Sequence, residues 1–279
     1  MHFSSIERIP LDVGEGAPVL CLHGSLGTSK QWRGLAAHLG SRYRVLAADL
    51  LGYAGEEDWP QGAPLQLRDE IEPLLATLQA LGHPVHLVGH SFGGAVALRL
   101  ALQRPDLVRS ITVFEPVSFG LLLARDHAAA STHEMRGYAD TVVLLAQQGA
   151  LHAAGRCFVD YWTKRGSWDS QAPERQAHLA RKMPKVAAEW GAVFTDNLND
   201  AELSRLRMPI TLMCGMDTAA PARRVVELLA DMLPQATTYR VPGVGHMGPF
   251  THAEKFNRTL AAILDNASLA QPPDCRVAA

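Results

Sequence analysis

Short apolar runs alternate with amphipathic segments along most of the chain. The runs are rich in Val, Ile and Leu, and they cover residues 18–22, 43–48, 85–88, 111–114 and 210–214, with a further strand-like segment at 236–241. Continuous apolar runs of this length are typical of strands that are buried on both faces. The segments between them have helical spacing, and they cover residues 67–81, 94–103, 222–233 and 252–264. The alternation predicts an α/β fold in which a mostly parallel central sheet carries helices on both faces.

One long segment, residues 117–207, interrupts this alternation. It contains no strand-like run, whereas its residues 141–147, 151–162 and 173–197 favour helices. We therefore expect three parts, which are a core at 1–116 and 208–266, an inserted helical cap at 117–207, and a flexible tail at 267–279.

A cap over the carboxyl ends of the strands would cover an apolar cleft. Its aromatic residues Phe119, Trp162 and Trp190 are candidates to contact a substrate there. Each ring could equally pack the helices of the cap against one another.

Composition and charge exclude several classes of protein. The 279 residues include 26 Lys and Arg against 28 Asp and Glu, and 47% are hydrophobic, so the chain can bury a sizeable core. The near-neutral balance predicts no binding to nucleic acid or to an anionic membrane surface. No apolar run is long enough to span a membrane, and the amino terminus does not resemble a secretion signal. Together with four scattered cysteines, these features predict a cytoplasmic protein.

The strongest chemical signal is the sequence Gly-His-Ser-Phe-Gly-Gly at 89–94, between a predicted strand and a predicted helix. A serine at such a sharp turn is forced into a strained backbone conformation, and the flanking glycines leave room for it. Ser91 would therefore present its hydroxyl at the end of the sheet. The amide of Phe92 would lie at the amino end of the helix, where it can stabilise a developing oxyanion.

A serine is a poor nucleophile at neutral pH unless a histidine takes its proton and a carboxylate orients that histidine. His246 lies in the loop before the last predicted helix, and Asp217 follows a predicted strand. Because the carboxyl ends of parallel strands meet at one edge, we expect Ser91, His246 and Asp217 to form a triad. Glu115, at the end of another strand, is the alternative acid. The histidines lack the spacing of metal ligands, so no metal and no other cofactor is expected.

With these motifs the chain resembles the α/β-hydrolase fold superfamily over about residues 10–265. Two further motifs carry the resemblance, His-Gly-Ser-Leu-Gly at 23–27 and Asp-Leu-Leu-Gly-Tyr at 49–53. The resemblance implies that the amide of Ser25 is the second donor to the oxyanion, with the amide of Leu26 as the alternative. It also implies a helical cap before the strand that bears the acid.

The chain departs from the family pattern at the acid. Asp217 follows Gly215 by two residues, whereas many relatives have a spacing of three. The order of nucleophile, acid and base along the chain still agrees with the superfamily.

These residues predict a serine hydrolase that cleaves a carboxylic ester or a related acyl bond of a small, apolar substrate through an acyl-enzyme. Leu26 and Met247 are further candidates to contact this small-molecule substrate. The same triad would serve an enol-lactonase, a meta-cleavage-product hydrolase that breaks a carbon–carbon bond, or a cofactor-free haloperoxidase or perhydrolase. A ligand-binding receptor on the same fold is the alternative without catalysis. The oligomeric state stays open, with a homodimer as one alternative.

Overall fold

The structure, a computed structural model, describes residues 8–53, 59 and 63–269. Its centre is a seven-stranded sheet with the order β1-β3-β2-β4-β5-β6-β7. The strands are β1 (Leu11–Val13), β2 (Ala17–Leu22), β3 (Tyr43–Ala48), β4 (Val85–His90), β5 (Val108–Phe114), β6 (Ile210–Gly215) and β7 (Thr237–Val241). Only β1 pairs antiparallel, with β3, and the pairs among β2 to β7 are parallel. The predicted α/β class and mostly parallel sheet are confirmed.

Helices cover both faces of this sheet, and a further group of helices is inserted between β5 and β6. They are α1 (Arg33–Leu39), α2 (Leu67–Ala80), α3 (Phe92–Gln103), α4 (Gly120–Arg125), α5 (Ala130–Gln147), α6 (Leu151–Trp162), α7 (Pro173–Arg181), α8 (Met183–Thr195), α9 (Asp200–Leu203), α10 (Ala220–Met232), α11 (Gly248–Thr251) and α12 (Ala253–Leu269). Short 3₁₀ turns lie at Ser29–Trp32, Gly40–Arg42 and Pro105–Leu107. Helix α5 begins well before residue 141, where the sequence pattern placed its start.

Alternate residues of the central strands pack against opposite helical layers. In β2, Leu20 and Leu22 belong to the apolar cluster that includes residues of α2, α3 and α10. Val19 and Cys21 belong to the cluster formed with α1 and α12. Because side chains alternate along a strand, an uninterrupted apolar run is what two covered faces require.

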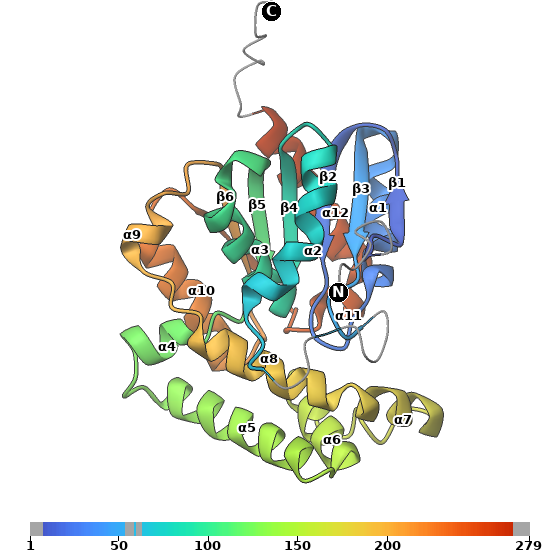
Figure 1. The fold of residues 1–279 in the computed structure, drawn as a ribbon, viewed down its shortest axis with the longest axis vertical. Coiled ribbons are helices and arrows are strands. Elements are labelled where there is room, and N and C mark those ends of the chain that lie inside the picture. Colours follow the sequence, from blue (N-terminus) through green and yellow to red (C-terminus); the bar gives the residue numbers. More distant parts are fainter. Residues whose placement is uncertain (1–7, 54–58, 60–62, 270–279) are drawn as a thin grey trace, which may run out of the picture.

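The helices α4 to α9 come between β5 and β6, and in Figure 1 α4 to α8 lie below the sheet. Helix α8 contacts α3 of the core as well as α5 and α6. It therefore links the inserted helices to the helix that begins directly after Ser91. The inserted segment is in position to cover the end of the sheet where that serine lies.

Helix α12 extends into the segment that the sequence predicted to be a flexible tail. Helix α12 continues to Leu269, so residues 267–269 are helical rather than part of an irregular tail. The rest of the expected flexible tail, residues 270–279, lies outside the described residues. Among the described residues no helix is long and apolar enough to cross a membrane.

Three histidines are buried on the central strands or at their ends. His23 follows β2, and His86 and His90 lie within β4, with exposed fractions of 0%, 0% and 2%. Burial lowers the pKa of His86 to about 4, and it also lowers the pKa values of His23 and His90. All three imidazoles are therefore neutral in the folded protein at neutral pH.

We expect the free energy of unfolding to fall as the pH drops below about 6.5, the ordinary pKa of histidine. Below that pH the histidines take up protons in the unfolded chain but stay neutral in the folded one. This difference lowers the free energy of unfolding by up to about 1.4 kcal/mol per pH unit for each buried histidine. Urea unfolding between about pH 7.5 and about pH 5.5 would measure this slope. His86→Asn should reduce the slope, whereas the substitution of the exposed His38 by Asn should not. An unchanged slope in His86→Asn would contradict the explanation.

A second prediction concerns the packing of α3 beneath β2. A Cβ atom added to Gly93 would lie 2.4 Å from the carbonyl oxygens of Leu22 and His23. Both are backbone atoms, so Gly93→Ala should lower the free energy of unfolding by roughly 1–3 kcal/mol. The control is Gly137→Ala in α5, where the added Cβ meets open space and should stabilise the helix by about 0.5–1 kcal/mol. Urea unfolding would compare the two, and a Gly93→Ala protein as stable as the wild type would refute the steric argument.

Candidate active site

Ser91 occupies the turn between β4 and α3 in a strained conformation, with φ 54° and ψ −119°. Hydrogen bonds hold this turn. The Ser91 amide donates to the carbonyl of Phe114 at 3.0 Å, and the Gly94 amide donates to the carbonyl of Ser91 at 2.9 Å. Leu26, Ser91 and Glu115 are the non-glycine residues with positive φ in the described part of the chain. All three lie at the ends of neighbouring strands, where backbone strain often marks a functional site.

A chain of two hydrogen bonds joins Ser91, His246 and Glu115. The Ser91 hydroxyl lies 2.9 Å from Nε2 of His246, and Nδ1 of His246 lies 2.7 Å from Oε2 of Glu115. The three residues are almost fully buried, with exposed fractions of 8%, 5% and 0%. The carboxylate therefore holds the imidazole with its other nitrogen directed at the serine hydroxyl.

Two further groups hold the carboxylate of Glu115. The amide of Gly215 donates to Oε1 at 2.7 Å, and the hydroxyl of Thr218 donates to Oε2 at 2.6 Å. Gly215 is the last residue of β6, and Thr218 lies in the turn that follows it. A buried carboxylate needs several hydrogen bonds to offset its lost hydration, and these two leave it directed at the histidine.

The prediction that Asp217 orients the histidine is wrong, because the partner of His246 is Glu115. Asp217 is exposed, and its amide donates to the carbonyl of Val244 at 3.0 Å. The position three residues after Gly215, where many relatives have their acid, is occupied by Thr218. The short spacing between Gly215 and Asp217 was therefore the sequence signal for an acid elsewhere.

The loop at 23–27 lies against the serine turn. A Cβ atom added to Gly24 would lie 3.1 Å from Cβ of Ser91, and Ser25 and Phe92 line one cavity with Ser91. The two amides predicted to bind an oxyanion thus belong to residues beside the serine. The backbone of Leu26, the alternative donor, hydrogen-bonds the hydroxyl of Tyr53.

His90 supports the loop that carries His246. Nε2 of His90 lies 3.0 Å from the carbonyl oxygen of His246, and the Gln31 side-chain amide lies 3.3 Å from Nδ1. Since the amide of Gln31 donates to Nδ1, Nε2 carries the proton and donates to the carbonyl. Burial and the neighbouring His246 keep the pKa of His90 well below its ordinary value. His90 is therefore a neutral hydrogen-bond donor that supports the His246 loop, rather than a base.

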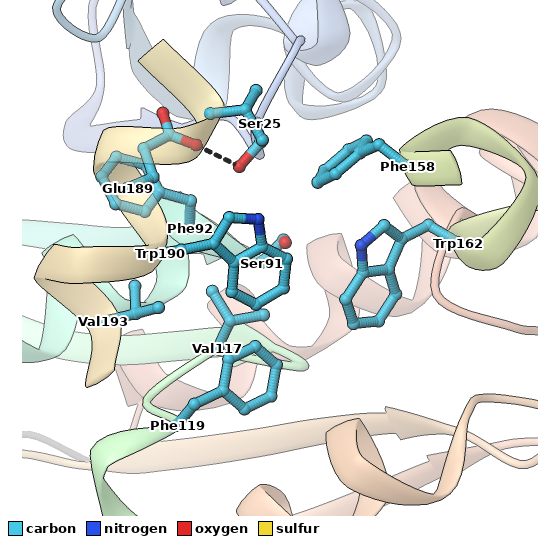
Figure 2. Close-up of a pocket in the computed structure, with 11 residues that line it drawn as sticks. Ser25, Ser91, Phe92, Val117, Phe119, Phe158, Trp162, Glu189, Trp190 and Val193 are labelled. Atoms are coloured by element: carbon cyan, nitrogen blue, oxygen red, sulfur yellow. Dashed lines mark hydrogen bonds between the residues drawn. The ribbon is translucent and has the colours of Figure 1, made fainter. Parts of the chain in front are cut away.

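An apolar cavity lies beside Ser91. Figure 2 shows Phe119, Trp162 and Trp190 around it, and these candidates lie in or next to the inserted helices. The ring of Trp162 also packs 4.2 Å from that of His246, measured between centroids. The indole nitrogen Nε1 of Trp190 is buried and finds no hydrogen-bond partner among the described residues.

An open cleft shares Ser91 and Trp162 with this cavity. Leu26 and Met247, the other two candidates, line the cleft. The lining also includes the exposed side chains of Lys30, Arg175, His178 and Phe250. Phe119 and Trp190 thus line the apolar cavity, Leu26 and Met247 line the cleft that reaches the surface, and Trp162 lines both.

Sequence reasoning did not identify a buried carboxylate in the cavity wall, Glu189 of α8, which is 3% exposed. Its position among apolar residues in the segment 173–197, which the pattern predicted to be helical, was the available signal. Among the described residues no group of His, Cys, Asp and Glu side chains could hold a metal ion.

Comparisons with known proteins agree with this architecture. A family model described as the alpha/beta hydrolase fold matches residues 17–253. The 2-hydroxymuconate semialdehyde hydrolase of Pseudomonas putida is 28% identical over 262 residues, which cover 92% of this chain and 90% of that protein.

Two solved structures share the fold. The enol-lactonase of Burkholderia xenovorans LB400 superposes with a TM-score of 0.70 at 19% identity, covering 91% of this chain and 95% of that chain. A bromoperoxidase of Bacillus anthracis superposes with a TM-score of 0.70 at 21% identity, covering 91% of this chain and 94% of that chain. Since the family model covers most of the sequence, the resemblance is confirmed, and the chain belongs to the alpha/beta hydrolase fold family of hydrolases.

Proposed function

We propose that the protein is a serine hydrolase that cleaves a carboxylic ester or a related acyl bond, with Ser91 as nucleophile, His246 as base and Glu115 as the orienting acid. The observation that carries this proposal is the buried chain of hydrogen bonds from the Ser91 hydroxyl to the Glu115 carboxylate. Its opening into an apolar cavity beside two candidate oxyanion donors supports acyl transfer over other chemistry.

In the first half of the reaction, Nε2 of His246 takes the proton of the Ser91 hydroxyl while Oγ attacks the substrate carbonyl. The amides of Ser25 and Phe92 donate to the oxygen that becomes negative. His246 then gives its proton to the leaving group, and the acyl group stays on Ser91. In the second half, water attacks the acyl-enzyme with the same base, and the acid product leaves.

Glu115 keeps its role throughout. It accepts a hydrogen bond from Nδ1–H, which fixes the tautomer of His246 and stabilises the imidazolium that forms. Its other partners, Gly215 and Thr218, prevent the carboxylate from turning away.

The cavity and the cleft suggest how the substrate binds. The apolar cavity, which carries several aromatic side chains, suits a small apolar acyl group. An acceptor oxygen on that group would satisfy the unpaired Nε1–H of Trp190. The leaving group would then lie in the open cleft near Met247.

Cleavage of a carbon–carbon bond is the second candidate activity. It is favoured by the similarity, along nearly the whole chain, to a 2-hydroxymuconate semialdehyde hydrolase. Turnover of that semialdehyde, compared with turnover of short p-nitrophenyl esters and of an enol-lactone, would distinguish the activities.

The first test is Ser91→Ala. We expect loss of kcat by several powers of ten, because the base no longer has a hydroxyl to activate. A fluorophosphonate probe should label the wild type at Ser91, as mapped by mass spectrometry, and should not label the variant. The control is Ser170→Ala, which removes an exposed hydroxyl. Labelling elsewhere, or esterase activity that survives Ser91→Ala, would refute the assignment and favour a ligand-binding receptor.

The second test compares the two carboxylates. Glu115→Gln should reduce kcat by about 10³–10⁴, because an amide cannot accept all three hydrogen bonds and so disturbs the histidine tautomer. Asp217→Asn should change kcat by less than about twofold, because an exposed side chain away from His246 contributes little. Steady-state kinetics on one ester would measure both. The reverse pattern would assign the acid to Asp217.

A further inference from the structure

A buried charged cluster lies behind the loop at 23–27. Nζ of Lys185 in α8 lies 2.9 Å from Oε1 of Glu70 in α2 and 2.8 Å from Oε1 of Glu189 in α8. Glu70, Lys185 and Glu189 are 2%, 2% and 3% exposed. Burial disfavours the ammonium, but the two carboxylates outweigh it and raise the pKa of Lys185. The cluster therefore joins a core helix to an inserted helix through fully desolvated charges.

Glu189 extends this cluster to the loop. Its Oε2 accepts the hydroxyl of Ser25 at 2.5 Å, shown as a dashed line in Figure 2. Its Oε1 accepts the hydroxyl of Tyr53 at 2.7 Å, and that hydroxyl also hydrogen-bonds the backbone of Leu26. Leu26 itself has a φ of 60°, a conformation that costs energy for a leucine. One carboxylate thus holds two successive residues of the loop, one of them strained.

Lys185 contacts the ring of Phe92, whose backbone amide is the other candidate oxyanion donor. Its Nζ lies 4.8 Å from the centre of the Phe92 ring and 5.2 Å from that of Tyr53, within the range of a cation–π contact. Residues four apart on one face of α8 therefore contact both residues whose amides are the candidate oxyanion donors, Ser25 through Glu189 and Phe92 through Lys185.

The energetics of this buried cluster do not favour a purely stabilising role. A buried ion pair seldom adds net stability relative to apolar residues, because desolvation offsets the attraction. In contrast, catalysis requires donors that are held in place before the oxyanion forms.

We propose that Glu189, supported by Lys185, is a positioning residue that holds the Ser25 amide in the oxyanion hole, so that the hole is complete only when α8 is packed on the core. This inference rests on the proposed serine hydrolase function. Glu189 is hydrogen-bonded to Ser25, Tyr53 and Lys185 rather than to Ser91 or His246, so it acts through the Ser25 side chain.

The test uses two variants that leave the backbone amide of Ser25 in the chain. Ser25→Ala removes the hydroxyl that binds Glu189, and Glu189→Gln replaces the carboxylate with an amide of the same shape. Each should lower kcat about 10- to 100-fold, less than the roughly 10²–10³-fold loss of a donor itself, with KM changed less than about threefold. A boronic acid that forms a tetrahedral adduct with Ser91 should lose affinity in the same proportion. A carboxylate product should bind as before.

The matched control is Asp196→Asn. Asp196, at the carboxyl end of α8, pairs with Arg99 of α3 at 2.7 Å, so it also joins α8 to the core but is away from the loop. The Asp196→Asn variant should keep the kcat and the boronate affinity of the wild type, even if its melting temperature is lower.

Three results would overturn the proposal. They are an effect of Ser25→Ala and Glu189→Gln on KM alone, no effect of either variant, and an equal loss of kcat in Asp196→Asn. Because Ser91 labelling and the Ser91→Ala assay are independent of these variants, failure of the positioning role is distinguishable from failure of the hydrolase function.

Discussion

The geometry of the candidate site depends on one buried carboxylate. Glu115 is fully buried at the end of β5 and accepts hydrogen bonds from the turn after β6 and from the imidazole in the loop after β7. A carboxylate in that position must have all its partners, because an unpaired buried charge costs several kcal/mol. It therefore fixes the ends of three neighbouring strands relative to one another. The direction of His246 toward Ser91 follows from that constraint.

Much of the architecture follows from patterns that are local in sequence. Apolar runs predicted the strands from β2 to β6 because both faces of those strands are covered. Strand β7, at the edge of the sheet, was predicted from the strand-like residues 236–241 although most of it is exposed. The sequence Gly-His-Ser-Phe-Gly-Gly predicted the serine turn because few side chains fit there, and the observed φ of Ser91 agrees. Strand β1 went unpredicted because it has only three residues, two of them exposed. Such a strand carries no apolar run.

The rest of the site depends on contacts between residues that are distant in sequence. Asp217 and Glu115 both end predicted strands, and only the relative placement of the strand ends decides which of them reaches the histidine. The spacing of two residues between Gly215 and Asp217 was the one local sign that Asp217 is not the acid. The hydrogen bond between Ser25 and Glu189 joins residues on separate elements, and no spacing rule connects them. Long-range pairs of this kind require the three-dimensional structure.

The cavity and the cleft that meet at Ser91 have different linings, and this difference has a kinetic consequence. Mostly buried, apolar side chains line the cavity, whereas several exposed polar side chains border the cleft. In the proposed reaction the departing group would diffuse out along the cleft while the acyl group stays in the apolar cavity. The vacated cleft would then admit water, and also any small alcohol or amine of suitable size. The partition between hydrolysis and transfer to such an acceptor would be governed by the width and polarity of the cleft rather than by the catalytic groups.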